Sequence, residues 1–200
     1  MKTLCDRQEL QDAFAVVSGI PPLKSTKPIL QNVLMRADDG GVTFFATDNE
    51  MSARSTLSSV KVSEPGVILL PAKEASALLR ELGDKTVAIQ AKDGRCRIEC
   101  GGGAFDLLSP DATEFPTEPS FAAEVEVEVT AKVFQAMQRM TSFAVAREET
   151  RYAINGLLLD FVDGCLRMVG TDGRRLALAY ANLPSNAQRA RAVVPLRALQ

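Results

Sequence analysis

The chain of 200 residues contains no histidine, and this absence narrows the chemistry that it can perform. Without imidazole, neither a Ser-His nor a Cys-His nucleophile pair can form. Cysteine is scarce as well, and the four cysteines are Cys5, Cys96, Cys100 and Cys165. They lack the second CxxC-type pair that a zinc site would need. Cys96 and Cys100 flank Ile98 at even spacing in a predicted strand, which favours buried, reduced thiols on the core side. We therefore expect no metal site.

Phosphate-binding loops are also missing, since neither GxxxxGK[ST] nor GxGxxG occurs. The lone glycine run at 101–103 is typical of a turn between strands, and Glu148-Glu149 is typical of solvated loop charge. We expect a protein that is not an enzyme and needs no cofactor. The alternative is a carboxylate-dependent hydrolase, whose activity would depend on Glu148 or Asp172.

Long apolar runs are absent, and no signal peptide opens the chain, so we expect a cytoplasmic protein. The composition, 46% hydrophobic and 24% charged, is that of a globular protein with a sizeable core. The net charge of −2 is unevenly distributed, because residues 144–200 carry eight arginines against five acids. An acidic protein can still bind nucleic acid if its positive charge gathers on one surface.

The sequence weakly repeats itself after 124 residues. Laying Leu30–Pro71 over Ile154–Pro195 needs no gap and gives seven identical pairs among 42. Upstream, the two copies align after a shift of one residue. Apolar residues at the spacing of one helix face then coincide: Leu10, Ala13, Phe14 and Val17 align with Val133, Ala136, Met137 and Met140. A period of this length indicates duplicated domains rather than a short-repeat solenoid.

The elements follow the same plan in each copy. Asp6 is a predicted helix cap, with Glu9 in capping-box position, and Thr130 caps the corresponding helix of the second copy. Further helices are expected at 72–82 and 131–141, and strands at 1–5, 29–37, 42–46, 52–57, 67–70, 86–91, 95–99, 104–109 and 124–129. Three Asp-Gly turns, at 39–40, 93–94 and 163–164, join hairpin strands.

These elements predict an α+β fold of duplicated domains, each made of two helix-plus-β-hairpin units with additional strands. The first domain covers 1–120 and the second 121–200, with a linker at 111–124. After Pro195 the second copy has only 196–200, the opening of its next helix. We expect the chain to be shorter than the duplicated unit that its own pattern describes.

Two segments of the second copy attract attention, Arg151-Tyr152-Ala153-Ile154-Asn155-Gly156 and Thr171-Asp172-Gly173-Arg174-Arg175-Leu176-Ala177. The second is equally typical of an ordinary turn with solvated arginines. Its counterpart in the first copy, Thr47-Asp48-Asn49-Glu50-Met51-Ser52, keeps the turn residues and differs in the side chains that follow. A repeat that keeps geometry and changes chemistry suggests a site added to a scaffold.

RYAINGLLL and TDGRRLA resemble motifs of the bacterial β sliding clamp, the processivity subunit of DNA polymerase III. The first copy agrees in its Val-Ser-Gly helix end, Lys-Pro-Ile-Leu segment and Ala-Thr-Asp-Asn-Glu-Met turn. The resemblance covers all 200 residues. It implies a DNA-clamp fold with three domains per chain, the C-terminal one absent here, with helices on the inner face and sheets outside. Two such chains close into a homodimer ring around duplex DNA.

By the family pattern, residues at the DNA-contacting positions are Lys24, Lys73, Arg147, Glu148, Tyr152 and Ala153. Glu148 stands where the family can carry a neutral amide, and Ala153 lacks an aromatic ring. The helix faces opposite the apolar stripes support weak, sequence-independent phosphate contacts, with Lys73 and Arg80 on one and Lys132 and Arg139 on another. A merely solvated helix face explains these charges equally well.

The resemblance also implies a cleft for partner peptides, formed by Ile154, Thr171, Gly173, Arg174, Arg175 and Leu176. Arg174 stands where histidine is frequent in the family. The implied partners are the replicative polymerase, the clamp loader and other proteins with clamp-binding motifs, and no membrane is involved. The alternative is a non-catalytic interaction module that uses the duplicated scaffold without encircling DNA.

Overall fold

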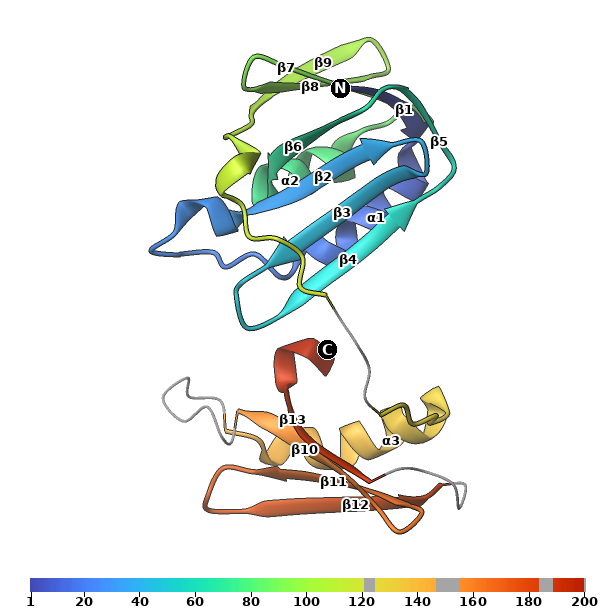
Figure 1. The fold of residues 1–200 in the computed structure, drawn as a ribbon, viewed down its shortest axis with the longest axis vertical. Helices are drawn as coiled ribbons and strands as arrows, with labels where there is room; N and C mark the ends of the chain where they lie inside the picture. Colours follow the sequence, from blue (N-terminus) through green and yellow to red (C-terminus); the bar gives the residue numbers. More distant parts are fainter. Residues whose placement is uncertain (121–124, 147–154, 184–188, 200) are drawn as a thin grey trace. The chain divides into compact units, whose positions relative to one another are not determined.

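The computed structural model describes residues 1–120, 125–146, 155–183 and 189–199 (Figure 1). The chain divides into two compact units, Met1–Pro119 and Ser120–Gln200. Within the described ranges, no helix has both the length and the apolar character that a membrane span requires.

The first unit contains two α-helices that cover one face of a sheet (Figure 1). The helices are α1 (Arg7–Ser18) and α2 (Ala72–Glu81), with short 3-10 helices at Pro28–Gln31 and Ala112–Glu114. The strands are β1 (Lys2–Asp6), β2 (Asn32–Asp38), β3 (Gly41–Thr47), β4 (Ser52–Leu57), β5 (Val60–Glu64), β6 (Gly66–Pro71), β7 (Thr86–Lys92), β8 (Arg95–Cys100) and β9 (Gly103–Leu108).

These strands form two sheets, β4-β3-β2-β6 and β5-β1-β7-β8-β9, in which every pairing is antiparallel. One continuous apolar core joins both sheets and both helices. The expected plan of helix plus hairpin, given twice, is confirmed: α1 precedes the β2–β3 hairpin, and α2 precedes the β7–β8 hairpin.

The start of α1 is fixed by its cap. The Asp6 carboxylate accepts hydrogen bonds from the backbone N–H groups of Gln8 (2.8 Å) and Glu9 (3.2 Å). The predicted apolar stripe is confirmed, since Leu10, Phe14 and Val17 are all buried. Phe14 contacts Phe44 of β3 edge to face, with 5.6 Å between ring centroids, and this contact packs the apolar side of α1 against the sheet.

Two expectations for the first unit were wrong, and one strand was not predicted. The strand expected from residue 29 begins only at Asn32, because residues 28–31 form a 3-10 helix whose carbonyls are bonded by the Asn32 side chain. Strand β5 was not predicted, since only its pairing with β1 makes it a strand. The segment at 111–118 is not a free linker, because Phe115 is buried against Phe45 and Leu69.

The Asp-Gly turns share a position but not a conformation. Asp93-Gly94 and Asp163-Gly164 both adopt positive φ, as type I′ hairpin turns require. In the turn at 39–40, the positive φ of 122° falls instead on Gly41, where a Cβ would lie 2.4 Å from a backbone oxygen. Only glycine fits there.

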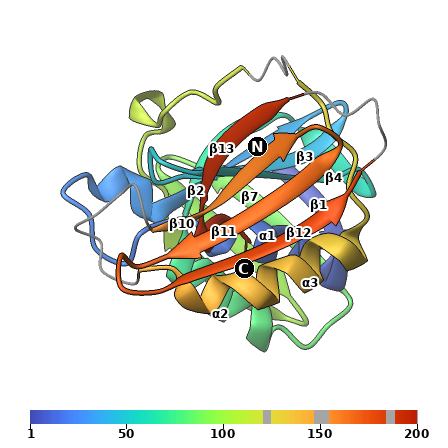
Figure 2. The ribbon, with the colours of Figure 1, turned by 90° about the horizontal axis from the view of Figure 1, so that it is seen from below.

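In the described part of the second unit, helix α3 (Ala131–Thr141) lies on one face of a four-stranded antiparallel sheet of order β12-β11-β10-β13 (Figure 2). The strands are β10 (Gly156–Val162), β11 (Cys165–Thr171), β12 (Leu176–Asn182) and β13 (Ala190–Pro195), with 3-10 helices at Ser142–Ala144 and Leu196–Leu199. The side of the sheet that faces α3 is apolar and contributes Leu157, Leu166 and Met168 to the core.

Two expectations for the second unit were wrong. Residues 125–129 form no strand, because β1 in the first unit depends on β5 and β7, and no described part of the second unit replaces those partners. In α3 only Met137 of the predicted stripe is buried, while Val133 and Met140 are exposed. Thr130 is the N-cap residue, but its side chain makes no capping bond.

Candidate functional site

The segment Thr171–Leu176 is a tightly bonded turn between β11 and β12. The Thr171 hydroxyl donates to the carbonyl of Arg175 (2.7 Å) and accepts from the N–H of Gly173 (3.1 Å). One oxygen of Asp172 accepts from the backbone N–H groups of Arg174 and Arg175, both at 2.9 Å. The turn therefore presents the two arginine side chains on a fixed backbone.

The same turn occurs 124 residues earlier with other side chains. The Thr47 hydroxyl donates to the carbonyl of Met51 (2.8 Å), and Asp48 accepts from the N–H groups of Glu50 (3.0 Å) and Met51 (2.7 Å). Asn49 has a φ of 72°, close to the 83° of its glycine counterpart. The duplicated geometry is thus retained, while an acid, a methionine and a serine give way to two arginines and a leucine.

The charge of Asp172 is stabilised by its surroundings. Hydrogen bonds from the backbone N–H groups of Arg174 and Arg175, and then the Arg175 guanidinium, lower the pKa of its carboxyl. The Arg175 Nε donates to the second carboxylate oxygen at 2.9 Å. The same guanidinium lies 5.9 Å from the ring centroid of Phe143, an exposed aromatic that sequence analysis missed. Its only sequence signal is an apolar residue just after a helix.

A hollow of about 350 Å³ lies beside Thr171, on the sheet face that points away from α3. It is lined by residues of β10, β11 and β13, among them Leu158, Val169, Arg191 and Val193. Sequence analysis missed this surface too, although Leu158 is identical to its counterpart Leu34. Leu176, in the neighbouring strand, is 66% exposed.

Two predicted DNA contacts lie in the first unit, both on exposed side chains. Lys24 follows Leu23, whose carbonyl accepts a 2.9 Å hydrogen bond from the Gln31 side chain, so the loop is anchored beside it. Lys73 is in the first turn of α2, which packs against α1. The exposed face of α2 also carries Arg80, together with the acids Glu74 and Glu81.

Helix α3 differs from the other two helices because its sequence contains no acid. Its exposed side carries Lys132, Gln135 and Arg139. By contrast, α1 carries Glu9 and Asp12 against a single arginine. Among the described α-helices, α3 is therefore the one whose charged side chains are all positive.

Five of the predicted site residues lie outside the described residues: Arg147, Glu148, Tyr152, Ala153 and Ile154. The structure brings together Thr171, Gly173, Arg174, Arg175 and Leu176 in one turn, and it has Lys24 and Lys73 on separate elements of the first unit.

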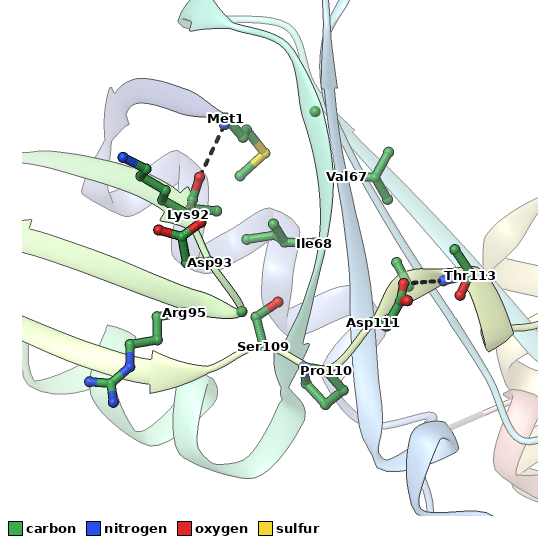
Figure 3. A pocket seen from close by; sticks show the side chains of 14 residues that line it. Met1, Val67, Ile68, Lys92, Asp93, Arg95, Ser109, Pro110, Asp111 and Thr113 are labelled. Atoms are coloured by element: carbon green, nitrogen blue, oxygen red, sulfur yellow. Dashed lines mark hydrogen bonds between the residues drawn. The ribbon is translucent and has the colours of Figure 1, made fainter.

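A cavity of about 640 Å³ lies in the first unit, and neither Lys24 nor Lys73 is among its lining residues (Figure 3). Its lining mixes charges of both signs, with Lys92 and Arg95 opposed by Asp93 and Asp111. The Asp111 carboxylate already accepts a hydrogen bond from the N–H of Thr113 at 2.9 Å. Its charge is thus used to cap the 3-10 helix rather than left for a ligand.

The cysteines have the chemistry of core residues. Burial raises the pKa of both Cys5 and Cys96 to about 12, so neither thiol ionises near neutrality. Cys96 and Cys100 are buried, as expected, whereas Cys165 is half-buried. Within the described ranges, no three metal-ligating side chains come together.

Duplicated α+β units with helices on one face of a sheet define a protein of the DNA-clamp fold. A DNA polymerase sliding clamp from Bacillus subtilis superposes with a TM-score of 0.91 at 27% identity, covering 100% of this chain and 55% of that chain. The sliding clamp of Pseudomonas aeruginosa bound to griselimycin gives a TM-score of 0.86 at 28% identity, covering 100% and 56%.

The family models of the DNA polymerase III beta subunit match its N-terminal domain at residues 1–119 and its central domain at 128–200. The chain therefore belongs to the DNA polymerase III beta subunit family, as the two motifs predicted. The beta sliding clamp of Chlamydia pneumoniae is 32% identical over 202 residues, covering 100% of this chain and 55% of that protein. The chain spans about half the length of the curated relatives it matches.

Proposed function

We propose that this chain is part of a non-catalytic processivity factor, which encircles duplex DNA as a homodimer ring and tethers the replicative polymerase to it in the cytoplasm. The chain contributes an N-terminal domain at 1–120 and part of a central domain at 121–200, and the longer protein contributes a third. Relatives that align with all or nearly all of this chain are named beta sliding clamp. The proposal needs no cofactor and no metal.

The cationic face of α3 is the main support for the DNA-binding part of the proposal. Lys132 and Arg139 are exposed on a helix without a single acid. Lys24 and Lys73 add exposed positive charge in the first unit. By the family pattern, Arg147, Glu148, Tyr152 and Ala153 complete the set.

A few lysines and arginines at helix surfaces suit sliding. They attract phosphates without reading bases, so no position on the duplex is preferred. Each phosphate contact releases about one counterion, which makes binding fall with salt. The hold on DNA would come from ring closure, while the charges centre the duplex.

Partner binding is proposed for the cleft that includes Ile154 and the turn from Thr171 to Leu176. An exposed leucine beside two arginines suits a short peptide with an apolar anchor and an acidic or polar flank. The comparison with the first unit supports this, because the duplicated turn there carries no such chemistry. The related Pseudomonas aeruginosa clamp binds griselimycin. The polymerase and the clamp loader are the proposed partners.

Ring closure needs an edge that can join a second chain. Strand β9 is an edge of its sheet, with Phe105 43% exposed and Leu108 72% exposed. An exposed edge strand with apolar side chains favours strand pairing between chains.

The DNA proposal is tested with the full-length protein on closed circular DNA. Retention on the circle and loss after linearisation are expected, whereas equal retention on both would favour an interaction module that does not encircle DNA. Lys24→Ala with Lys73→Ala should weaken loading and lower the slope of log K against log salt by about 2. Peptide affinity should not change in that double variant.

The cleft is tested with Arg175→Ala and a labelled peptide carrying an apolar anchor. We expect peptide affinity to fall about tenfold while DNA retention stays at the wild-type level. Arg189→Ala, an exposed arginine paired with Asp163 on the β10–β11 hairpin, is the matched control and should change neither. Equal losses of DNA and peptide binding in Arg175→Ala would contradict the division into two sites.

A further inference from the structure

Phe143 is an exposed aromatic residue on a backbone that is otherwise buried. It lies in the 3-10 helix Ser142–Ala144, directly after α3, and is 58% exposed. Its neighbours Thr141, Ala144 and Val145 are all buried, the last at 2% exposure. The ring does not belong to the apolar core of the second unit, and the buried neighbours hold it at the surface.

The end of α3 lies directly against the strand that leads into the turn at Thr171. A Cβ on Gly170 would lie 2.3 Å from the backbone oxygen of Thr141, so only glycine lets the helix end approach β11 this closely. The Thr141 hydroxyl donates to the carbonyl of Met137 at 2.8 Å, which fixes the last turn of the helix. The position of Phe143 beside the turn is therefore set by tight backbone packing.

The Arg175 side chain is held on two sides. Its Nε donates to the Asp172 carboxylate at 2.9 Å, and its guanidinium carbon lies 5.9 Å from the centroid of the Phe143 ring. At this distance the cation is attracted by the face of the ring. Among the described residues, the terminal amine groups of Arg175 make no hydrogen bond, so they remain a fork of donors.

The first unit has neither member of this pair. In the alignment of the two copies, Phe143 corresponds to Ile20 and Arg175 corresponds to Met51. Ile20 packs against the core of the first unit, whereas Phe143 is exposed. The aromatic ring and the cation therefore occur together, in the unit that carries the proposed cleft, and both are replaced in the other unit.

We propose that Phe143 is a positioning residue of the partner-peptide cleft: together with Asp172 it aims the Arg175 guanidinium at a carboxylate in the flank of the bound peptide. This inference rests on the proposed function of the turn and deepens it by naming the charge that the cleft selects. A carboxylate can accept two parallel hydrogen bonds from a guanidinium. A guanidinium that is already held in place loses little conformational freedom when the peptide binds.

The test compares two labelled peptides on the full-length protein by fluorescence anisotropy. The peptides share one apolar anchor and differ only in the flank, which carries aspartate in one and asparagine in the other. We expect Phe143→Leu to weaken binding of the aspartate peptide about three- to fivefold, the strength of an exposed cation–π contact, and to leave the asparagine peptide unchanged. Phe143→Trp should restore the affinity, because indole attracts cations most strongly.

The Arg175→Ala variant provides the second background for a double-mutant cycle. There Phe143→Leu should have no further effect, because the ring acts only through the guanidinium. Met140→Ala is the matched control: it removes an exposed apolar side chain one turn earlier on α3 and should change neither affinity.

Three results would overturn the proposal: equal weakening of both peptides, weakening that persists without Arg175, or no effect on the aspartate peptide. The first two would indicate that Phe143 only supports the local structure. If the unaltered protein bound neither peptide, the cleft of the proposed function would itself be overturned, and this inference with it.

Discussion

Replacing Phe115 by alanine tests whether 111–118 belongs to the first unit or merely links two domains. Phe115 is 6% exposed and packs on Phe45 and Leu69. Burial of a phenyl ring contributes about 2–3 kcal/mol, and the edge-to-face pair with Phe45 adds about 1 kcal/mol. We therefore expect Phe115→Ala to reduce the free energy of unfolding of the first unit by about 3–4 kcal/mol, a large part of typical domain stability.

The assay is hydrogen exchange of the β3 and β6 amides in the whole chain as a function of urea. With a slope of about 2 kcal/mol per molar urea, the midpoint should fall by roughly 2 M. Phe105→Ala is the matched control, because Phe105 is 43% exposed in the same unit and should cost about 1 kcal/mol or less. Equal losses in the two variants would refute the assignment of this segment to the first core.

Three further outcomes are expected. Cys165 should react with a maleimide in the native protein, while Cys5, whose pKa is raised to about 12 by burial, should react only on unfolding; equal rates would refute the burial. Because the pKa of Asp172 is lowered from 3.8, the stabilisation of its turn should persist near neutral pH and disappear as the pH falls through that lowered value, which amide chemical shifts would follow. We expect Gly170→Ala to unfold the second unit, because a Cβ there would lie 2.3 Å from a backbone oxygen of α3. Gly83→Ala should be tolerated, because the added Cβ meets nothing within 4 Å, and calorimetry on both variants checks this.

Much of the fold follows from local patterns. The cap at Asp6 and the stripe of α1 were predictable because they depend on residues within one or two turns of each other. The hairpin strands were predictable because alternation and Asp-Gly turns are also local signals. The turn at Thr171 was predictable from the duplication, since the threonine and the aspartate that build it recur at Thr47 and Asp48.

The errors fall where a partner distant in sequence decides the structure. Strand β5 exists because β1 lies beside it, and residues 125–129 lack a comparable partner among the described residues. The stripe of α3 failed because helical spacing shows which residues share a side and not which side another element covers. Val133 and Met140 are apolar and exposed for that reason.

The sequence by itself determined the duplicated α+β plan, the family, and the exchange of side chains at one duplicated turn, because all of these are carried by residue identity and short spacing. Only the tertiary structure decided which apolar surfaces are covered. Burial depends on elements brought together from far along the chain, as Phe115 is brought to Phe45. Phe45 and its duplicated counterpart Val169 have the same strand register, and only the fold buries the first and leaves the second partly exposed.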